Sequence, residues 1–173
     1  NQMINWGILG FGKMGFTFAN AIKETSNSKL IGIASKSGNT FENFENKTYE
    51  NLIDDKKIDA IYISTLNNTH ISLIKKIIKT GKKILCEKPV STSLKELTEV
   101  NKLILDHNIH FYEAIAYYSH QQTTDLLSLI NNDEIGEINS IESNFGYKAK
   151  FKPSSRVFDK LLGGGSIFDL GCY

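Results

Sequence analysis

The sequence of 173 residues contains little cysteine, proline or tryptophan: two cysteines, two prolines and one tryptophan. Cys86 and Cys172 lack the paired spacing of a metal site or a disulfide framework, so we expect free thiols, no metal and a reducing compartment. No apolar run approaches the roughly 18 residues that cross a bilayer. The chain opens directly on a strand pattern instead of a secretory signal. We therefore expect a cytoplasmic protein with no membrane partner.

An excess of charge of either sign is also absent. The formal net charge is +1, whereas a nucleic-acid-binding domain is usually strongly basic, so we expect no nucleic-acid partner. The share of hydrophobic residues, 40%, and of charged residues, 23%, is ordinary for a globular protein. By length, the chain holds one full domain and part of a second.

Short apolar runs alternate with helical patterns up to about residue 116. The expected strands are Ile4–Leu9, Leu30–Ser35, Ala60–Thr65, Ile84–Glu87 and Phe111–Ala116. Helical spacing is clearest around residues 18–22, 71–79 and 94–104, and Ser93 with Glu96 forms a capping box before the last of these. Nearly continuous apolar strands are typical of a parallel sheet covered on both faces. The sequence therefore predicts the α/β class, with a Rossmann-type doubly wound parallel sheet over residues 1–118.

The pattern changes after residue 118. Residues 123–133 predict a short helix, residues 137–150 alternate like a half-exposed strand, and a glycine run at 163–165 precedes another helix. A single strand cannot form a stable sheet. We therefore expect residues 119–173 to begin an incomplete α+β second domain, in a chain that is a fragment, or the ordered part, of a longer protein.

A glycine-rich turn follows the first expected strand and opens a helix: Gly10-Phe11-Gly12-Lys13-Met14-Gly15. In a G-x-G-x-x-G turn of this kind the first glycine permits the tight turn and the second lets the backbone approach a pyrophosphate. The third allows the helix to pack closely on the strand. Amides at the start of the helix then bind the anion. We expect all six residues to contribute to a dinucleotide site; the alternative is a glycine turn without a ligand.

The end of the second strand indicates which coenzyme is bound. An acidic residue there would bind the ribose hydroxyl of NAD, whereas a basic residue accommodates the phosphate of NADP. This chain has Ser35 and Lys36 and no acid, which favours NADP. NAD stays open, because Lys36 could equally be a solvated surface lysine.

Loops at the carboxyl ends of the later strands supply further candidates. Thr65, Leu66, Asn67 and His70 lie between the third expected strand and its helix, where they would face the coenzyme. For His70 a place in the first helical turn, after a cap at Asn68 or Thr69, is an equal alternative.

Glu87-Lys88-Pro89 ends the fourth expected strand. Pro89 biases Lys88 toward an extended backbone, which would aim its side chain out of the end of the sheet. A lysine in a partly dry cleft can donate a proton. Asp169 and Tyr173 are four residues apart on the last expected helix and so share a face, where the carboxylate could orient a lysine and the phenol could exchange a proton. The alternative is an ordinary acid at a helix start.

Together these motifs resemble the glucose–fructose oxidoreductase, inositol dehydrogenase and MocA family. The resemblance covers residues 5–173. It is carried by Trp6–Gly12, Ala34–Lys36, Asp59–Thr65, Gly81–Pro89, Glu113–Ala114 and Gly163–Tyr173. Leu66 departs from the family, which usually has proline there.

The resemblance implies an NAD(P)-dependent oxidoreductase that transfers hydride between a nicotinamide and a sugar, polyol or related hydroxy or carbonyl compound. It makes Lys88, Asp169 and Tyr173 the catalytic residues, and it adds Glu87 and Lys88 to the coenzyme contacts. The tyrosine is similar to that of the branch containing glucose–fructose oxidoreductase and dihydrodiol dehydrogenase, which favours NADP. The family also implies a homo-oligomer for the full-length protein.

Two other functions stay open within that resemblance. One is a coenzyme-binding regulator without catalysis, and the other is a glycoside hydrolase that uses tightly held NAD in a redox-elimination cycle. A regulator has no need of Lys88, Asp169 and Tyr173 together, so their presence favours the oxidoreductase.

Overall fold

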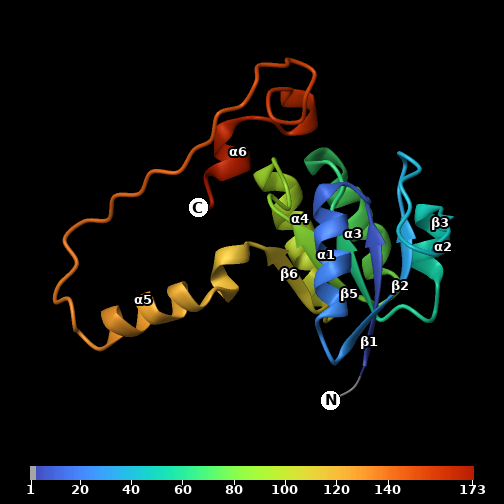
Figure 1. Cartoon of the computed structure of the whole chain (residues 1–173), viewed down its shortest axis with the longest axis horizontal. Coiled ribbons are helices and arrows are strands. Elements are labelled where there is room, and N and C mark those ends of the chain that lie inside the picture. Colours follow the sequence, from blue (N-terminus) through green and yellow to red (C-terminus); the bar gives the residue numbers. More distant parts are fainter. Residues whose placement is uncertain (1–2) are drawn as a thin grey trace.

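Six parallel strands form the sheet of the computed structural model, which describes residues 3–173 (Figure 1). The strands are β1 (Ile4–Leu9), β2 (Ser28–Ala34), β3 (Asn46–Lys47), β4 (Ala60–Ile63), β5 (Lys83–Glu87) and β6 (Phe111–Ala114). Their order is β3-β2-β1-β4-β5-β6, and every neighbouring pair is parallel. This is the strand order of a doubly wound dinucleotide-binding sheet, so the predicted Rossmann-type fold is confirmed.

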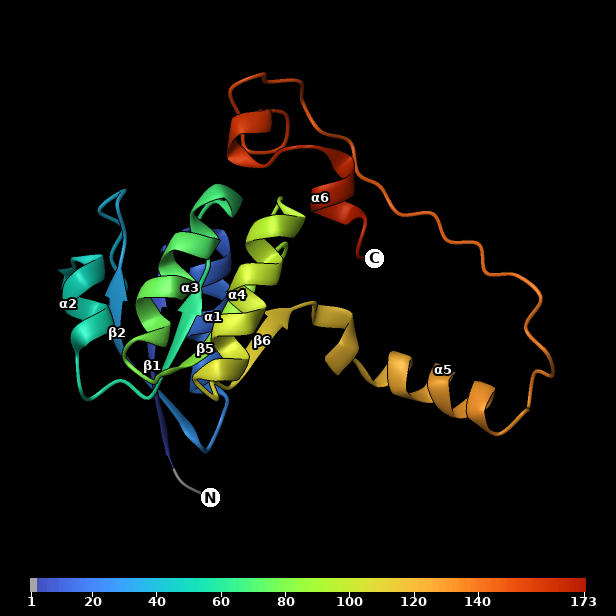
Figure 2. The ribbon, with the colours of Figure 1, turned by 180° about the vertical axis from the view of Figure 1, so that it is seen from behind.

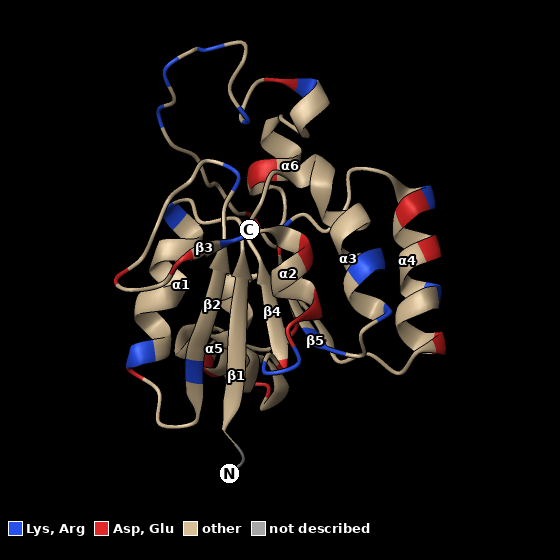
Figure 3. Cartoon of the chain, turned by 90° about the vertical axis from the view of Figure 1, so that its right-hand side faces the viewer, with Lys and Arg blue, Asp and Glu red and all other residues tan. Residues whose placement is uncertain are grey.

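Helices cover both faces of the sheet, as the two opposite views show (Figures 1 and 2). On one face lies α1 (Lys13–Lys23), which connects β1 to β2. On the other face lie α2 (Tyr49–Asp54), α3 (His70–Ile78) and α4 (Leu94–Asp106). Figure 3 shows charged positions along α3 and α4, where Lys75 pairs with Glu99 across the two helices at 3.3 Å.

The apolar core is divided by the sheet into two clusters. The larger one packs α2, α3 and α4 on the strands and includes the fully buried Leu52, Ile74 and Val100. The smaller one lies under α1, where Trp6 meets Phe18 edge to face at 5.1 Å between ring centroids. Full burial of an aliphatic side chain contributes roughly 1.5–3 kcal/mol. Packing on both faces therefore fixes the sheet, and with it the positions of the carboxyl ends of the strands.

Several expected boundaries need correction. β2, β4 and β6 end one or two residues earlier than predicted, because the backbone leaves the ladder there for turns. For example, the amide and carbonyl of Ser35 are hydrogen-bonded by the Asn46 side chain instead of by a strand. The sequence also gave no sign of β3 or α2, which have two and six residues. Half of the expected capping box forms at α4: the Glu96 amide donates to the Ser93 hydroxyl at 3.4 Å, whereas the Ser93 amide donates to the Ser91 hydroxyl and not to the Glu96 side chain.

The rest of the chain leaves the sheet and returns to it. α5 (Gln121–Asn131) extends away from the body, and α6 (Ser166–Leu170) lies back near the carboxyl edge of the sheet (Figures 1 and 2). The predicted strand at 137–150 is wrong: no strand forms there. An extended segment becomes a strand only where a neighbour pairs with its amides and carbonyls. The described residues provide none, and side chains such as Ile141 stay exposed.

Within residues 3–173 no helix is long and apolar enough to cross a membrane, and no three metal-binding side chains gather. Cys86 is buried and Cys172 is partly exposed. The division of the chain at residue 118 stays a prediction.

Candidate active site

The carboxyl ends of β1 and β4 lie side by side where the order of the sheet reverses. The chain leaves β1 on its way to β2 and comes back to β4 on the other side of β1. Crevices at such a point bind ligands in open α/β sheets. Hydrogen bonds close the two loops together: the Ser64 hydroxyl donates to the carbonyl of Gly10 at 2.5 Å, and the Ser64 amide donates to Leu9 at 2.8 Å.

The glycine turn has the geometry that its three glycines predict. Gly10 has φ +85°, a conformation that side chains rarely adopt. A Cβ on Gly15 would lie 2.6 Å from the Gly10 carbonyl oxygen, so only glycine lets α1 pack this close to β1. A Cβ on Gly12 would meet no protein atom within 4 Å, and thus nothing in the protein requires glycine there. The space left open beside Gly12 fits the approach of a ligand.

The start of α1 offers backbone donors to that space. The first amides of a helix have no partner within the helix, and Gly12, at the cap position, has no side chain to accept from them. Lys13 and Met14 follow with exposed side chains, whereas the Phe11 side chain is buried under α1. Asn39 fixes the loop by donating to the Phe11 carbonyl at 2.7 Å.

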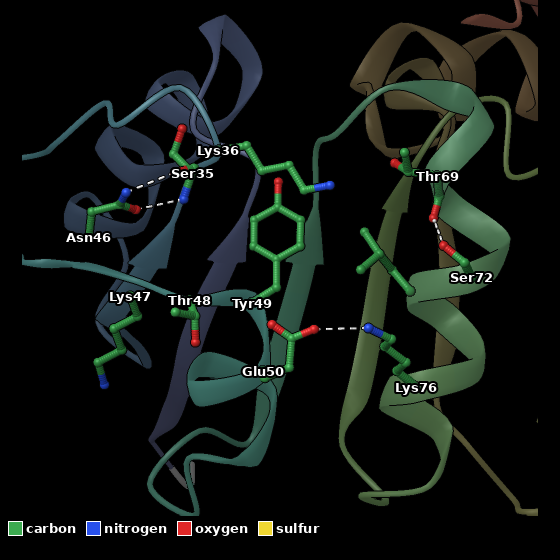
Figure 4. A pocket seen from close by; sticks show the side chains of 11 residues that line it. Ser35, Lys36, Asn46, Lys47, Thr48, Tyr49, Glu50, Thr69, Ser72 and Lys76 are labelled. Carbon is green, nitrogen blue, oxygen red and sulfur yellow. Dashed lines mark hydrogen bonds and ion pairs between the residues drawn. The ribbon is translucent and has the colours of Figure 1, made fainter. Parts of the chain in front are cut away.

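Ser35 and Lys36 line a cavity of about 460 Å³ between the end of β2, α2 and α3. Ser35 is buried, and its hydroxyl lies 2.9 Å from that of Ser37. The Lys36 ammonium lies 5.6 Å from the centroid of the Tyr49 ring, on the cavity side (Figure 4). Lys36 therefore lines the cavity while it stays exposed to solvent.

Of the four residues predicted to contact the coenzyme in the loop after β4, some lie at the carboxyl edge of the sheet and others bind neighbouring segments of the protein. Thr65 and the half-exposed Leu66 lie at the carboxyl edge, beside the glycine turn. The Asn67 amide donates to the carbonyl of Gly163 at 3.0 Å. His70 is fully buried, with Nδ1 2.9 Å from the Pro89 carbonyl oxygen and Nε2 3.2 Å from that of Thr65. The His70 ring thus joins the loops after β4 and β5 and does not line the crevice.

Lys88, Asp169 and Tyr173 come together at the end of β5. Lys88 Nζ lies 3.6 Å from Asp169 Oδ1 and donates a hydrogen bond to the Asp169 carbonyl oxygen. It also lies 5.2 Å from the centroid of the Tyr173 ring. The side chains of Lys88 and Asp169 are only 15% and 13% exposed, so the charged pair is largely shielded from water. Glu87, the residue before Lys88, accepts a hydrogen bond from the Tyr62 hydroxyl at 2.5 Å.

The reason given for the closeness of Asp169 and Tyr173 needs correction. α6 ends at Leu170, and Tyr173 lies beyond the helix in a turn whose amide donates to Leu170. The two side chains therefore share no helix face. They meet because the chain folds back on Lys88, which contacts both.

Asp169 has two further partners that sequence reasoning missed. The Tyr147 hydroxyl donates to Oδ2 at 2.6 Å, and Arg156 donates to Oδ1 at 3.2 Å. Burial raises the pKa of Asp169, but these hydrogen bonds, with the charges of Arg156 and Lys88, outweigh it and lower the pKa below its usual value. Asp169 is therefore ionised at neutral pH.

Two aromatic rings lie beside the partly exposed Tyr173. Tyr117 lies 5.7 Å and Phe145 5.4 Å from it between ring centroids. Burial raises the pKa of Tyr173, and the neighbouring Cys172 and Glu87 raise it further, so the phenol keeps its proton at neutral pH. The only signal for these neighbours was the alternation at 137–150, which places Phe145 and Tyr147 on one side of an extended chain.

Comparison with known proteins agrees with this geometry. Residues 4–114 match the GFO/IDH/MocA model, whose description is "Oxidoreductase family, NAD-binding Rossmann fold". The chain belongs to this family. The match begins at β1 and ends with β6, so it covers the whole sheet.

Several curated relatives are dehydrogenases. The chain is 28% identical to trans-1,2-dihydrobenzene-1,2-diol dehydrogenase of Xenopus tropicalis, over 97% of this chain and 53% of the relative. It is 32% identical to D-xylose 1-dehydrogenase (NADP(+)) 2 of Haloferax volcanii, over 73% of this chain and 38% of the relative. The chain thus spans about half the length, or less, of these relatives.

Solved structures show the same fold. An NAD-binding protein from Listeria innocua matches with a TM-score of 0.75 and 21% identity, over 99% of this chain and 51% of that one. Scyllo-inositol dehydrogenase from Lactobacillus casei, solved with NAD(H) and scyllo-inositol, matches with a TM-score of 0.70 and 20% identity. That match covers 79% of this chain and 43% of the other.

Proposed function

We propose that this chain carries the coenzyme site and catalytic cluster of an NAD(P)-dependent oxidoreductase acting on a CH–OH group of a sugar, polyol or diol. One observation supports this above others: Lys88, Asp169 and Tyr173 meet at the same sheet edge as the glycine turn. The names of the diol and xylose dehydrogenases among the relatives support the substrate class.

The residues present fit a nicotinamide coenzyme. The open space at Gly12 and the amides at the start of α1 suit the pyrophosphate, and the cavity beside Ser35 and Lys36 suits the adenosine end. We infer a preference for NADP, because Lys36 faces that cavity and no acidic residue stands directly after β2, where Ser35 and Lys36 follow Ala34. The bound nicotinamide supplies the carbon that accepts or releases the hydride.

The chain's own residues would move the proton and stabilise charge. In the oxidation of an alcohol, Tyr173 would first release its own proton to solvent, and the phenolate would then take the hydroxyl proton as the carbinol carbon gives up its hydride, so that a carbonyl compound results. In reduction the protonated Tyr173, favoured by its raised pKa, gives its proton to the carbonyl oxygen. The Lys88 ammonium stabilises the negative charge that develops on that oxygen. Asp169, held ionised by Tyr147 and Arg156, keeps Lys88 in place.

Turnover measurements test this proposal. With NADP⁺ and a panel of sugars, polyols and trans-diols, we expect NADPH to form with at least one substrate. We expect Tyr173→Phe or Lys88→Met to lower kcat roughly 10²- to 10⁴-fold while NADPH still binds. Tyr117→Phe is the matched control, since it changes an aromatic neighbour outside the Lys88–Asp169 pair.

Two results would contradict the oxidoreductase. Coenzyme binding without turnover of any panel member would favour a regulator. Coenzyme that is retained through purification, with cleavage of a glycoside and no net change in its redox state, would favour the redox-elimination hydrolase.

A further inference from the structure

The cavity beside Lys36 carries more positive charge than the end of β2 alone provides. Three lysines line it, Lys36, Lys47 and Lys76, with a single carboxylate, Glu50, and hydroxyls of serine, threonine and tyrosine (Figure 4). A hollow with this lining is suited to a phosphate group.

The three lysines differ in their partners. Lys47 is drawn to Asp55, which lies outside the cavity lining, at 2.7 Å between Nζ and Oδ2. Lys36 lies over the Tyr49 ring and forms no ion pair among residues 3–173. Lys76 is paired with Glu50 at 2.9 Å. Lys76 is thus the one lysine whose charge is cancelled by a carboxylate of the cavity itself.

The Glu50–Lys76 pair joins two walls of the cavity. Glu50 lies in the first turn of α2 and Lys76 in the last turn of α3, and their side chains point toward each other (Figure 4). The hydrogen bond from Lys76 lowers the pKa of Glu50, which is therefore ionised at neutral pH. The side chains are 54% exposed for Lys76 and 64% for Glu50. Pairs this exposed are weak, so an incoming anion can compete for the lysine.

We propose that Glu50 and Lys76 are specificity-determining residues for the coenzyme. Glu50 competes with the 2′-phosphate of NADP for Lys76, and it thereby limits the preference for NADPH over NADH that Lys36 provides. This inference rests on the proposed function, because it takes the cavity to hold the adenosine end of the coenzyme. It places part of the selectivity on α2 and α3, away from the turn after β2.

Substitutions that separate the two charges test the inference. Glu50→Gln frees Lys76 and removes one negative charge, so we expect NADPH to bind roughly threefold to tenfold more tightly with the NADH Kd unchanged. Lys76→Gln should weaken the binding of NADPH by a similar factor. Adenosine 2′,5′-bisphosphate and 5′-AMP serve as probes that compete with the coenzyme. The two substitutions should change the affinity for the bisphosphate, which carries the 2′-phosphate, and leave that for 5′-AMP unchanged.

The double variant shows whether Glu50 acts through Lys76. In the Lys76→Gln background, Glu50→Gln has no ion-paired lysine to release and removes only the weaker attraction between Glu50 and Lys36, so its gain in NADPH affinity should shrink. An equal gain in both backgrounds would overturn the coupling. Glu99→Gln and Lys75→Gln break the neighbouring pair between α3 and α4, outside the cavity, and should leave both coenzymes unaffected.

The results of these binding experiments distinguish a failure of this inference from a failure of the proposed function. If the wild-type chain binds NADPH but Glu50→Gln changes nothing, or changes NADPH and NADH alike, only the inference fails. If the folded wild-type chain binds neither coenzyme, both fail.

Discussion

At the scale of single residues, His70 shows how a buried polar side chain can support a site without lining it. Its two ring nitrogens face carbonyl oxygens of Thr65 and Pro89, so the ring links the loops that follow β4 and β5. The second of these loops begins with Lys88. Burial lowers the pKa of His70, although both carbonyls and the charges of Glu87 and Glu113 oppose the shift.

That lowered pKa predicts a loss of stability in acid. The pKa of a histidine in an unfolded chain is about 6.5. The folded pKa lies below this value, so the unfolded chain binds more protons between the two. The free energy of unfolding should therefore fall as the pH drops through that window. Urea unfolding between pH 5 and pH 8, with protein and salt concentration fixed, measures the slope.

His70→Asn should flatten that slope and also lower stability at pH 8 by roughly 1–3 kcal/mol, since it removes the hydrogen bond that the buried neutral ring donates to one of the two carbonyl oxygens. His107→Asn is the control for the loss of an imidazole as such, since it changes an exposed histidine at the end of α4. An unchanged slope in His70→Asn would contradict the assignment of this pH dependence to His70.

At the scale of elements, the turn from β1 to α1 contains one glycine needed for packing, Gly15, and one that we assign to coenzyme binding, Gly12. Gly15→Ala places a Cβ 2.6 Å from the Gly10 carbonyl oxygen, so we expect it to lower the free energy of unfolding by roughly 1–3 kcal/mol. Gly12→Ala meets no protein atom within 4 Å, so it should lower stability by less than about 1 kcal/mol. It should nonetheless weaken NADPH binding, because the methyl group occupies the space of the pyrophosphate.

Thermal unfolding and coenzyme titration of the two variants measure both effects. A Gly12→Ala variant that binds NADPH as tightly as the wild type would show that the open space beside Gly12 is not the pyrophosphate site.

Elements with strong local signals were predictable from the sequence. The glycine turn and the Glu87-Lys88-Pro89 strand end are both contiguous, and the structure has β1 and β5 where the apolar runs lie. β3 and α2 are too short to leave a periodic pattern. The prediction of a strand at 137–150 was wrong because an alternating hydrophobic pattern shows which side chains share a face. It does not show whether a neighbouring strand is there to pair with.

The contacts of Asp169 were beyond sequence reasoning for another reason. Tyr147 and Arg156 are 22 and 13 residues away in sequence, and no periodicity relates them to Asp169. The Glu50–Lys76 pair likewise joins two helices that are separated by β4. Such pairs become visible only once the chain is folded.

At the scale of the whole molecule, the candidate site is assembled from distant parts of the chain. Residues 160–173 lie over the carboxyl edge of a sheet whose last strand ends at Ala114. Asn67 and Asn68 hold this segment by donating to the carbonyls of Gly163, at 3.0 Å, and Leu161, at 3.1 Å. A Cβ on Gly163 would lie 2.8 Å from that of Asn67, so the approach of the two segments requires glycine. The sheet therefore positions Asp169 and Tyr173 as well as the glycine turn.

The central claim is that this sheet edge binds a nicotinamide coenzyme, with Lys36 favouring the phosphorylated form. The most direct test is a titration of the purified chain with NADPH and with NADH, in which the fluorescence emission of the nicotinamide reports binding. We expect saturable binding of both coenzymes, tighter for NADPH, with the difference reduced in Lys36→Gln. Equal or tighter binding of NADH by the wild type would contradict the role of Lys36, and no binding of either coenzyme by a folded chain would contradict the account as a whole.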